Sequence, residues 1–177
     1  MQNLNSFLSL YKQNNKLPIR LISPTFGNMP SEITDIYGYA HRKSHYFLLF
    51  MLEGRSQHGV DLQQFEIEKN ELLFILPYQI HRVPHTKQGT NYFKLGFDEE
   101  CLSRLPTQYP FFVNPFNNQK IQLTPAAAAR VKSVFEILLE LLRTMDTDPE
   151  LILAHLNSLL TEINAAYFSS DKNPADD

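Results

Sequence analysis

The feature that most constrains the fold is a series of short apolar runs, separated by glycine and proline, across residues 41–97. Residues 46–52 are seven apolar residues in a row, which in a short chain predicts a strand buried on both faces. Further strands are expected at residues 57–68, 72–76 and 92–97. Many short strands with turns between them are typical of a small antiparallel barrel or jelly roll, whose side chains converge on a central cavity. A cavity of that kind binds or transforms a small molecule.

Two helices are predicted to follow the strands. Thr124–Pro125 and Asp148–Pro149 each place a capping residue before a proline at the first helical position. Both helices carry an apolar stripe at four-three spacing, and further apolar residues widen each stripe beyond one face. We expect the pair to pack against the barrel and against a second subunit in a homodimer; covering only its own barrel is the alternative. The residues assigned to the dimer contact are Val131, Phe135, Leu138, Leu142, Met145, Ile152, Leu156, Leu159 and Ile163.

A single cysteine and a slightly acidic net charge limit the expected cellular location and binding partners of the protein. Cys101 cannot form an internal disulfide, which fits a reducing, cytoplasmic location. The formal net charge of −3 argues against a basic nucleic-acid-binding face in this chain. No signal peptide is expected, and no apolar stretch approaches the roughly 20 residues that cross a bilayer, so no membrane contact is expected.

Six histidines raise the question of a metal site. His41 and His45 are four residues apart, which separates them by about 13 Å in an extended strand, whereas a shared ion needs bonds of about 2 Å. His81 and His85 have the same spacing, so no metal and no other cofactor are expected. His81 is expected to hold the start of a strand, with a role in the pocket as the alternative, and His58 is expected in a turn.

The sequence does not carry the patterns of familiar catalytic sites. It has no Ser-His-Asp order, no Gly-rich phosphate loop, no CxxC pair and no HExxH helix. No catalytic residue is therefore assigned.

Several segments within residues 36–105 resemble a known family. They are the pair His41 and His45, followed by FLLFMLEG, HGVDLQQFEIEKNELLFILPYQIHR and TNYFKLGF. This pattern is similar to the N-terminal cupin-like domain of AraC-type bacterial transcription regulators, in which a Pro-Gly-Gln-x-His corner precedes a strand. Here Tyr78 stands in the place of that glycine. The resemblance implies a mainly β fold with C-terminal helices: a cupin-like double-stranded β-helix, or jelly-roll barrel, followed by two antiparallel α-helices that mediate dimerisation.

The chain is expected to divide into four segments. Residues 1–18 form an arm with a short helix, 19–123 the cupin-like barrel, 124–168 the helical dimerisation hairpin and 169–177 a disordered polar tail. The helix-turn-helix pair of the resembled family is missing from this sequence. The tail would then begin the linker to that domain, and a stand-alone protein is the alternative.

Ligand-binding candidates come from the alternating faces of the expected strands. One face of the central strand, residues 47, 49 and 51, is assigned to the cavity, and the opposite face, residues 46, 48 and 50, is the alternative. The resemblance places Tyr92 and Lys94 where the sugar-binding member of the family lines its pocket, and Tyr39 near a pocket-facing polar position. The assigned residues are Tyr39, Phe47, Leu49, Met51, His81, Tyr92 and Lys94. A buried Lys94 needs a carboxylate from the ligand or from the protein, and an ordinary exposed lysine is the alternative.

These features together favour an effector-sensing and dimerising domain of a transcription regulator, with a sugar or another small organic compound in the barrel. DNA would be contacted only through a C-terminal domain that is not in this chain. The alternatives are a metal-dependent cupin enzyme, such as an isomerase or dioxygenase, and a stand-alone sugar-binding module.

Overall fold

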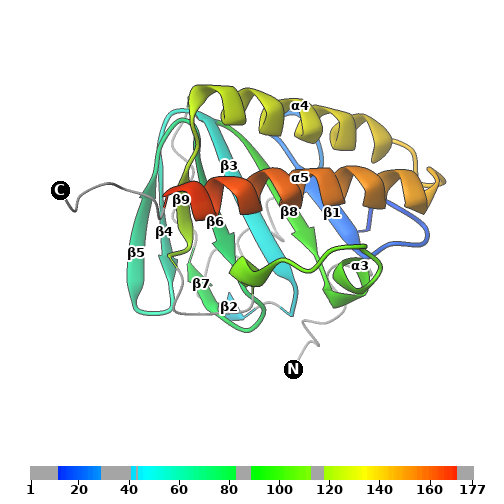
Figure 1. The fold of residues 1–177 in the computed structure, drawn as a ribbon, viewed down its shortest axis with the longest axis horizontal. Coiled ribbons are helices and arrows are strands. Elements are labelled where there is room, and N and C mark those ends of the chain that lie inside the picture. The colour runs from blue at the N-terminus through cyan, green and yellow to red at the C-terminus, as the bar shows by residue number, and fades with distance from the viewer. Residues whose placement is uncertain (1–11, 29–40, 43, 83–88, 113–117, 171–177) are drawn as a thin grey trace.

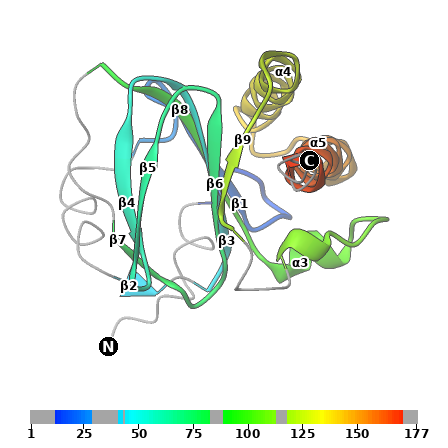
Figure 2. The ribbon, with the colours of Figure 1, turned by 60° about the vertical axis from the view of Figure 1, so that its left-hand side comes forward.

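Two antiparallel β-sheets face each other, and helices cover the outer face of one of them (Figure 1 and Figure 2). The computed structural model describes residues 12–28, 41–42, 44–82, 89–112 and 118–170. Residues 1–11, which make up most of the expected N-terminal arm, lie outside these described residues.

The chain crosses between the two sheets repeatedly. The larger sheet has the order β1 (Ile19–Ile22), β8 (Asn91–Phe97), β3 (Tyr46–Glu53), β6 (Glu71–Ile75) and β9 (Lys120–Gln122). The smaller sheet has the order β2 (His41–Arg42), β7 (Ile80–Arg82), β4 (Ser56–Val60) and β5 (Gln63–Ile67). Neighbouring strands are antiparallel in both sheets. The predicted jelly-roll barrel with C-terminal helices is confirmed.

The central strand β3 separates two cores, because successive side chains of a strand point to opposite faces. Leu48 and Phe50 belong to the core under the helices. Phe47, Leu49 and Met51 belong to a second cluster between the two sheets. All five side chains are at most 6% exposed, so the prediction of a strand buried on both faces is confirmed.

The two long helices, α4 (Pro125–Leu141) and α5 (Pro149–Ser170), run antiparallel across the larger sheet (Figure 1). Thr124 caps α4, since its hydroxyl accepts a hydrogen bond from the backbone N–H of Ala127 at 3.2 Å. The carboxylate of Asp148 accepts a hydrogen bond from the N–H of Glu150 at 2.9 Å, at the start of α5. The helix starts therefore agree with the two capping motifs, while α5 extends to Ser170 rather than ending at residue 168.

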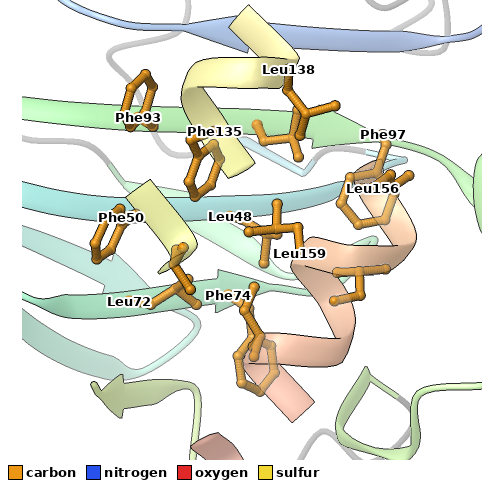
Figure 3. Packing of buried hydrophobic residues seen from close by; sticks show 14 of the residues in the cluster. Leu48, Phe50, Leu72, Phe74, Phe93, Phe97, Phe135, Leu138, Leu156 and Leu159 are labelled. Atoms are coloured by element: carbon orange, nitrogen blue, oxygen red, sulfur yellow. The ribbon is translucent and has the colours of Figure 1, made fainter. Parts of the chain in front are cut away.

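Phe135 of α4 packs between two rings of the larger sheet (Figure 3). Its ring centroid lies 5.0 Å from that of Phe93 and 5.9 Å from that of Phe50, and the three planes are nearly parallel. Leucines of both helices continue this contact along the sheet, among them Leu138 and Leu156. Burial of this apolar surface fixes the helices on the barrel.

The placement of the helix stripes corrects the residues assigned to the dimer contact. Eight of the nine residues are at most 2% exposed and fill the core of their own chain, so in this arrangement they offer no surface to a second subunit. Those eight are Val131, Phe135, Leu138, Leu142, Ile152, Leu156, Leu159 and Ile163. Met145, the ninth, is 42% exposed. The apolar residues exposed on α4 and α5 are instead Ile137, Leu151 and Phe168.

A short helix, α3 (Glu99–Ser103), and a 3-10 turn, η2 (Pro110–Phe112), lie between β8 and β9. Asp98 caps α3 through hydrogen bonds from the N–H groups of Glu100 and Cys101. None of the helices in the described part of the chain is long and apolar enough to cross a membrane.

The proline corner before β7 is held by the side chains of Gln79 and Asp61. Gln79 accepts a hydrogen bond from the N–H of Leu76 at 2.9 Å and donates to Asp61 at 3.0 Å. Asp61 also accepts from the N–H of Ile80 at 2.9 Å. Tyr78, which replaces the glycine of the resembled family, has φ of 69°, in the left-handed region that glycine adopts most easily. A tyrosine therefore occupies a backbone conformation that favours glycine at this corner.

Candidate functional site

The inner face of β3 and β8 carries several of the predicted ligand residues. In the antiparallel register Leu49 lies opposite Lys94, and Met51 lies opposite Tyr92. Directly opposed residues point to the same side of a sheet, so Lys94 and Tyr92 face the interior between the sheets. Both are partly exposed, whereas Leu49 and Met51 are buried. Solvent therefore reaches the interior beside β8.

Apolar side chains from both sheets form the floor of this interior. Their cluster contains Phe47, Leu49, Met51, Val60, Ile67, Leu73 and Ile75. Phe65 and Tyr92 pack against it and are partly exposed. A mostly apolar interior with a few fixed polar groups is the usual composition of a small-molecule site. The cluster also answers the question that the sequence left open, because residues 47, 49 and 51 are the face that points inward.

Two histidines of the smaller sheet meet inside the barrel. His58 of β4 and His81 of β7 are 2% and 1% exposed, and the Nδ1 atom of His58 lies 3.2 Å from Nε2 of His81. The hydroxyl of Ser56 lies 2.8 Å from Nε2 of His58, which extends the hydrogen-bonded chain to three residues. The ring of His81 also lies 5.3 Å from that of Phe47, centroid to centroid. The expectation that His58 lies in a turn is therefore wrong.

The position of His58 changes its protonation. Burial, and then the positive charge of Lys94, lower the pKa of His58 from 6.5 to about 4. The imidazole is neutral at pH 7, so one of its nitrogens donates a hydrogen bond and the other accepts one. The charge of Lys94 is therefore felt at His58.

Lys94 is a charged group on an inward position of β8. Its Nζ lies 4.7 Å from the ring centroid of Tyr92, in a cation–π contact. Burial lowers the pKa of Lys94 and raises that of the Tyr92 hydroxyl. Among the described residues, no carboxylate lies within 4.0 Å of the Lys94 ammonium. The ordinary exposed lysine considered as the alternative does not match this environment.

The structure brings six of the seven predicted ligand residues to the interior. They are Phe47, Leu49, Met51, His81, Tyr92 and Lys94. Tyr39 lies outside the described residues. Sequence reasoning missed His58, although the alternation of Ser56, His58 and Val60 along one strand face could have indicated an inward position.

The described residues contain no group of three histidine, cysteine, aspartate or glutamate side chains that could hold a metal ion. His58 and His81 are joined directly to each other by a hydrogen bond. The positive charge of Lys94 acts on His58 and disfavours a second cation nearby.

A separate surface cleft of about 360 Å³ lies outside the barrel, beside α3. Tyr46, Glu99, Leu102 and Tyr109 are among its lining residues. The hydroxyl of Tyr46 donates a hydrogen bond to Glu99 at 2.9 Å, and burial together with this contact raises the pKa of Tyr46 to about 12. The Tyr46 hydroxyl and the Glu99 carboxylate, two polar groups of this cleft, are therefore bonded to each other.

Several solved structures are similar to this chain. The AraC-like transcriptional activator CuxR is 16% identical, with 71% of this chain and 42% of that chain covered and a TM-score of 0.46. ToxT from Vibrio cholerae is 9% identical, with 76% and 54% covered and a TM-score of 0.41. A cupin barrel protein from Salinispora arenicola is 15% identical, with 50% and 82% covered and a TM-score of 0.32. The chain thus spans about half the length of the two regulators.

No curated protein matches the chain at a significant level. The family of AraC-like ligand binding domains matches residues 31–160, which include β2 to β9, α3, α4 and the first half of α5. This range contains Lys94, Tyr92 and the histidine pair. The chain belongs to the family of AraC-like ligand binding domains.

Proposed function

We propose that this domain senses a small organic effector in its barrel and transmits the binding event to a transcription regulator. The observation that carries the proposal is the convergence of His58, His81, Tyr92 and Lys94 over an apolar floor. Family membership supports a ligand-sensing role rather than catalysis. DNA binding would belong to a separate domain of the regulator, and a cytoplasmic location is part of this proposal.

Residues 12–17, at the end of the N-terminal arm, connect strand β1 to the helices, which supports a coupling between ligand binding and the helix layer. Asn14 donates a side-chain hydrogen bond to the carbonyl of Thr147 at 2.9 Å, and the N–H of Asn15 donates to the carbonyl of Met145 at 2.8 Å. Residues 12–17 are thereby attached to the connection between α4 and α5. They lead into β1, in which Ile22 lies opposite Lys94. A ligand that contacts Lys94 differently in two arrangements of this segment would shift the population between them.

We propose that a homodimer transmits this shift. The exposed apolar side chains of the helix layer, Ile137, Met145 and Leu151, are 39%, 42% and 46% exposed and provide the contact surface of this proposal. The buried stripe residues hold the helices on the barrel. In this proposal the inner side of the helix layer stabilises the fold, and the outer side forms the dimer contact.

A thermal-shift screen over sugars, organic acids and aromatic compounds tests the sensing role. A compound that binds the folded domain raises its melting temperature by mass action. Tyr92→Ala is expected to abolish the rise, because Tyr92 packs against the interior cluster. Tyr78→Ala is the matched control, since Tyr78 is 65% exposed on the corner. Compounds that bind the two variants equally well would contradict a site in the barrel.

A further inference from the structure

The ammonium of Lys94 has no carboxylate within 4.0 Å among the described residues. Lys94 and Arg20 both lie on inward positions of the larger sheet, since Arg20 is opposite Gly96 and Gly96 is opposite Phe47. Arg20 is held by the carbonyl of Gly27. Lys94 contacts the ring of Tyr92, and the neighbouring His58 is neutral at pH 7.

The carboxylates on and beside the surrounding strands contact groups other than Lys94. Glu71 of β6 is 3.2 Å from Lys120 and accepts the N–H of Glu68 at 2.8 Å. Asp61 holds the proline corner, and Glu66 pairs with Arg55 on the surface. A partly buried ammonium without a nearby anion is costly, because burial removes water that a counter-charge must replace.

We propose that the ligand is an organic anion, with a carboxylate that pairs with Lys94 and an apolar body that lies on the Phe47, Leu49 and Met51 cluster. This inference rests on the proposed sensing function and names the chemical class of the effector. The contact would be a charge-assisted hydrogen bond in a region shielded from water, which is stronger than the same contact on the surface.

The polar groups of the interior favour an acid over a sugar. A sugar needs several hydrogen-bonding groups arranged around its ring. Both ring nitrogens of His58 are already engaged, one by Ser56 at 2.8 Å and the other by His81 at 3.2 Å, and the floor beside them is apolar. Arg20 is held by the carbonyl of Gly27, and the Lys94 ammonium over the apolar floor instead matches a carboxylate attached to a hydrocarbon or aromatic group.

Titration calorimetry on the full chain tests the proposal with 3-phenylpropanoate, 4-phenylbutanoate and hexanoate, each against its primary amide. The amide keeps the shape of the acid and removes the charge, so this comparison needs no variant. We expect at least one acid to bind saturably, with its amide roughly tenfold weaker or more. Lys94→Met is expected to remove that preference, and Lys132→Met, on the surface of α4, is expected to keep it. Melting of Lys94→Met by circular dichroism shows separately that the variant folds.

Three results would overturn the acid class. The first is equal binding of acids and amides, and the second is the absence of any acid binding. In the second case the sensing function can still hold. It holds if a neutral compound binds the wild type but not Tyr92→Ala. The third concerns Glu32 and Asp35, which lie outside the described residues. Acid binding that emerges only in the Glu32→Gln/Asp35→Asn variant would show that a carboxylate of the chain itself neutralises Lys94.

Discussion

The imidazoles of His58 and His81 are hydrogen-bonded to each other at 3.2 Å, which links strands β4 and β7 inside the barrel. Neither ring is on the surface, and the ring of His81 lies against Phe47 of β3. The pair therefore contributes both to the stability of the smaller sheet and to the wall of the proposed ligand site.

Acidification is expected to destabilise the fold through His58. The unfolded chain takes up a proton near pH 6.5, while the folded chain takes it up near pH 4, with Lys94 of β8 and His81 of β7 facing the ring. Between these values the unfolded state binds more protons, so stability present above pH 6.5 is lost as the pH falls to 4, by on the order of 3 kcal/mol. Urea unfolding from pH 7 to pH 4 measures this loss. His58→Gln, which cannot take up the proton, should show a flatter profile; identical slopes would contradict the assignment.

A double-mutant cycle measures the contact between the two histidines. His58→Ala and His81→Ala each remove a buried ring, so each is expected to lower the free energy of unfolding by about 2–4 kcal/mol. Their shared hydrogen bond predicts a coupling of about 1 kcal/mol in the double variant. Chemical denaturation of the four proteins gives this coupling. Fully additive effects would mean that the contact contributes nothing to stability.

Phe135 is expected to be the most sensitive position of the helix layer. Phe135→Ala removes a ring that packs between Phe50 and Phe93, so we expect a loss of about 3–5 kcal/mol in the free energy of unfolding. Ile137→Ala is the control on the same helix, because Ile137 is 39% exposed and should lose less than about 1 kcal/mol. Similar losses in both variants, measured by guanidinium unfolding, would contradict the assignment of the inner face.

The outer face of the helices is expected to determine oligomeric state. Ile137→Glu combined with Leu151→Glu changes two exposed residues and should convert the proposed dimer into a monomer in light scattering, with little change in melting temperature. Leu138→Glu buries a charge in the core instead and should unfold the chain. A dimer that persists in the double variant would place the contact elsewhere.

The strands and helices were predictable because their signals are local. The run at residues 46–52 indicated a strand buried on both faces, and Thr124–Pro125 marked the start of α4. Periodicity alone could not say which surface a helix stripe would meet. Phe135 and Leu156 repeat with the same spacing whether they contact a sheet or a second subunit, and only the folded structure places them on the sheet.

The site was predictable in part for the same reason. Alternation placed Tyr92 and Lys94 on one strand face, and the pairing of β3 with β8 sets them beside Met51 and Leu49. The bond between His58 and His81 joins residues 23 positions apart in sequence. It depends on the register between β4 and β7, in which Val60 lies opposite His81, and a single sequence does not reveal that register.

The most direct measurement is a ¹H–¹⁵N NMR titration of the domain with a compound that raises its melting temperature. Binding in the barrel predicts that the largest shifts fall on Leu49, His58, Tyr92 and Lys94, on the inner faces of the two sheets. Shifts centred instead on Glu99, Leu102 and Tyr109, around the cleft beside α3, would contradict the proposed site.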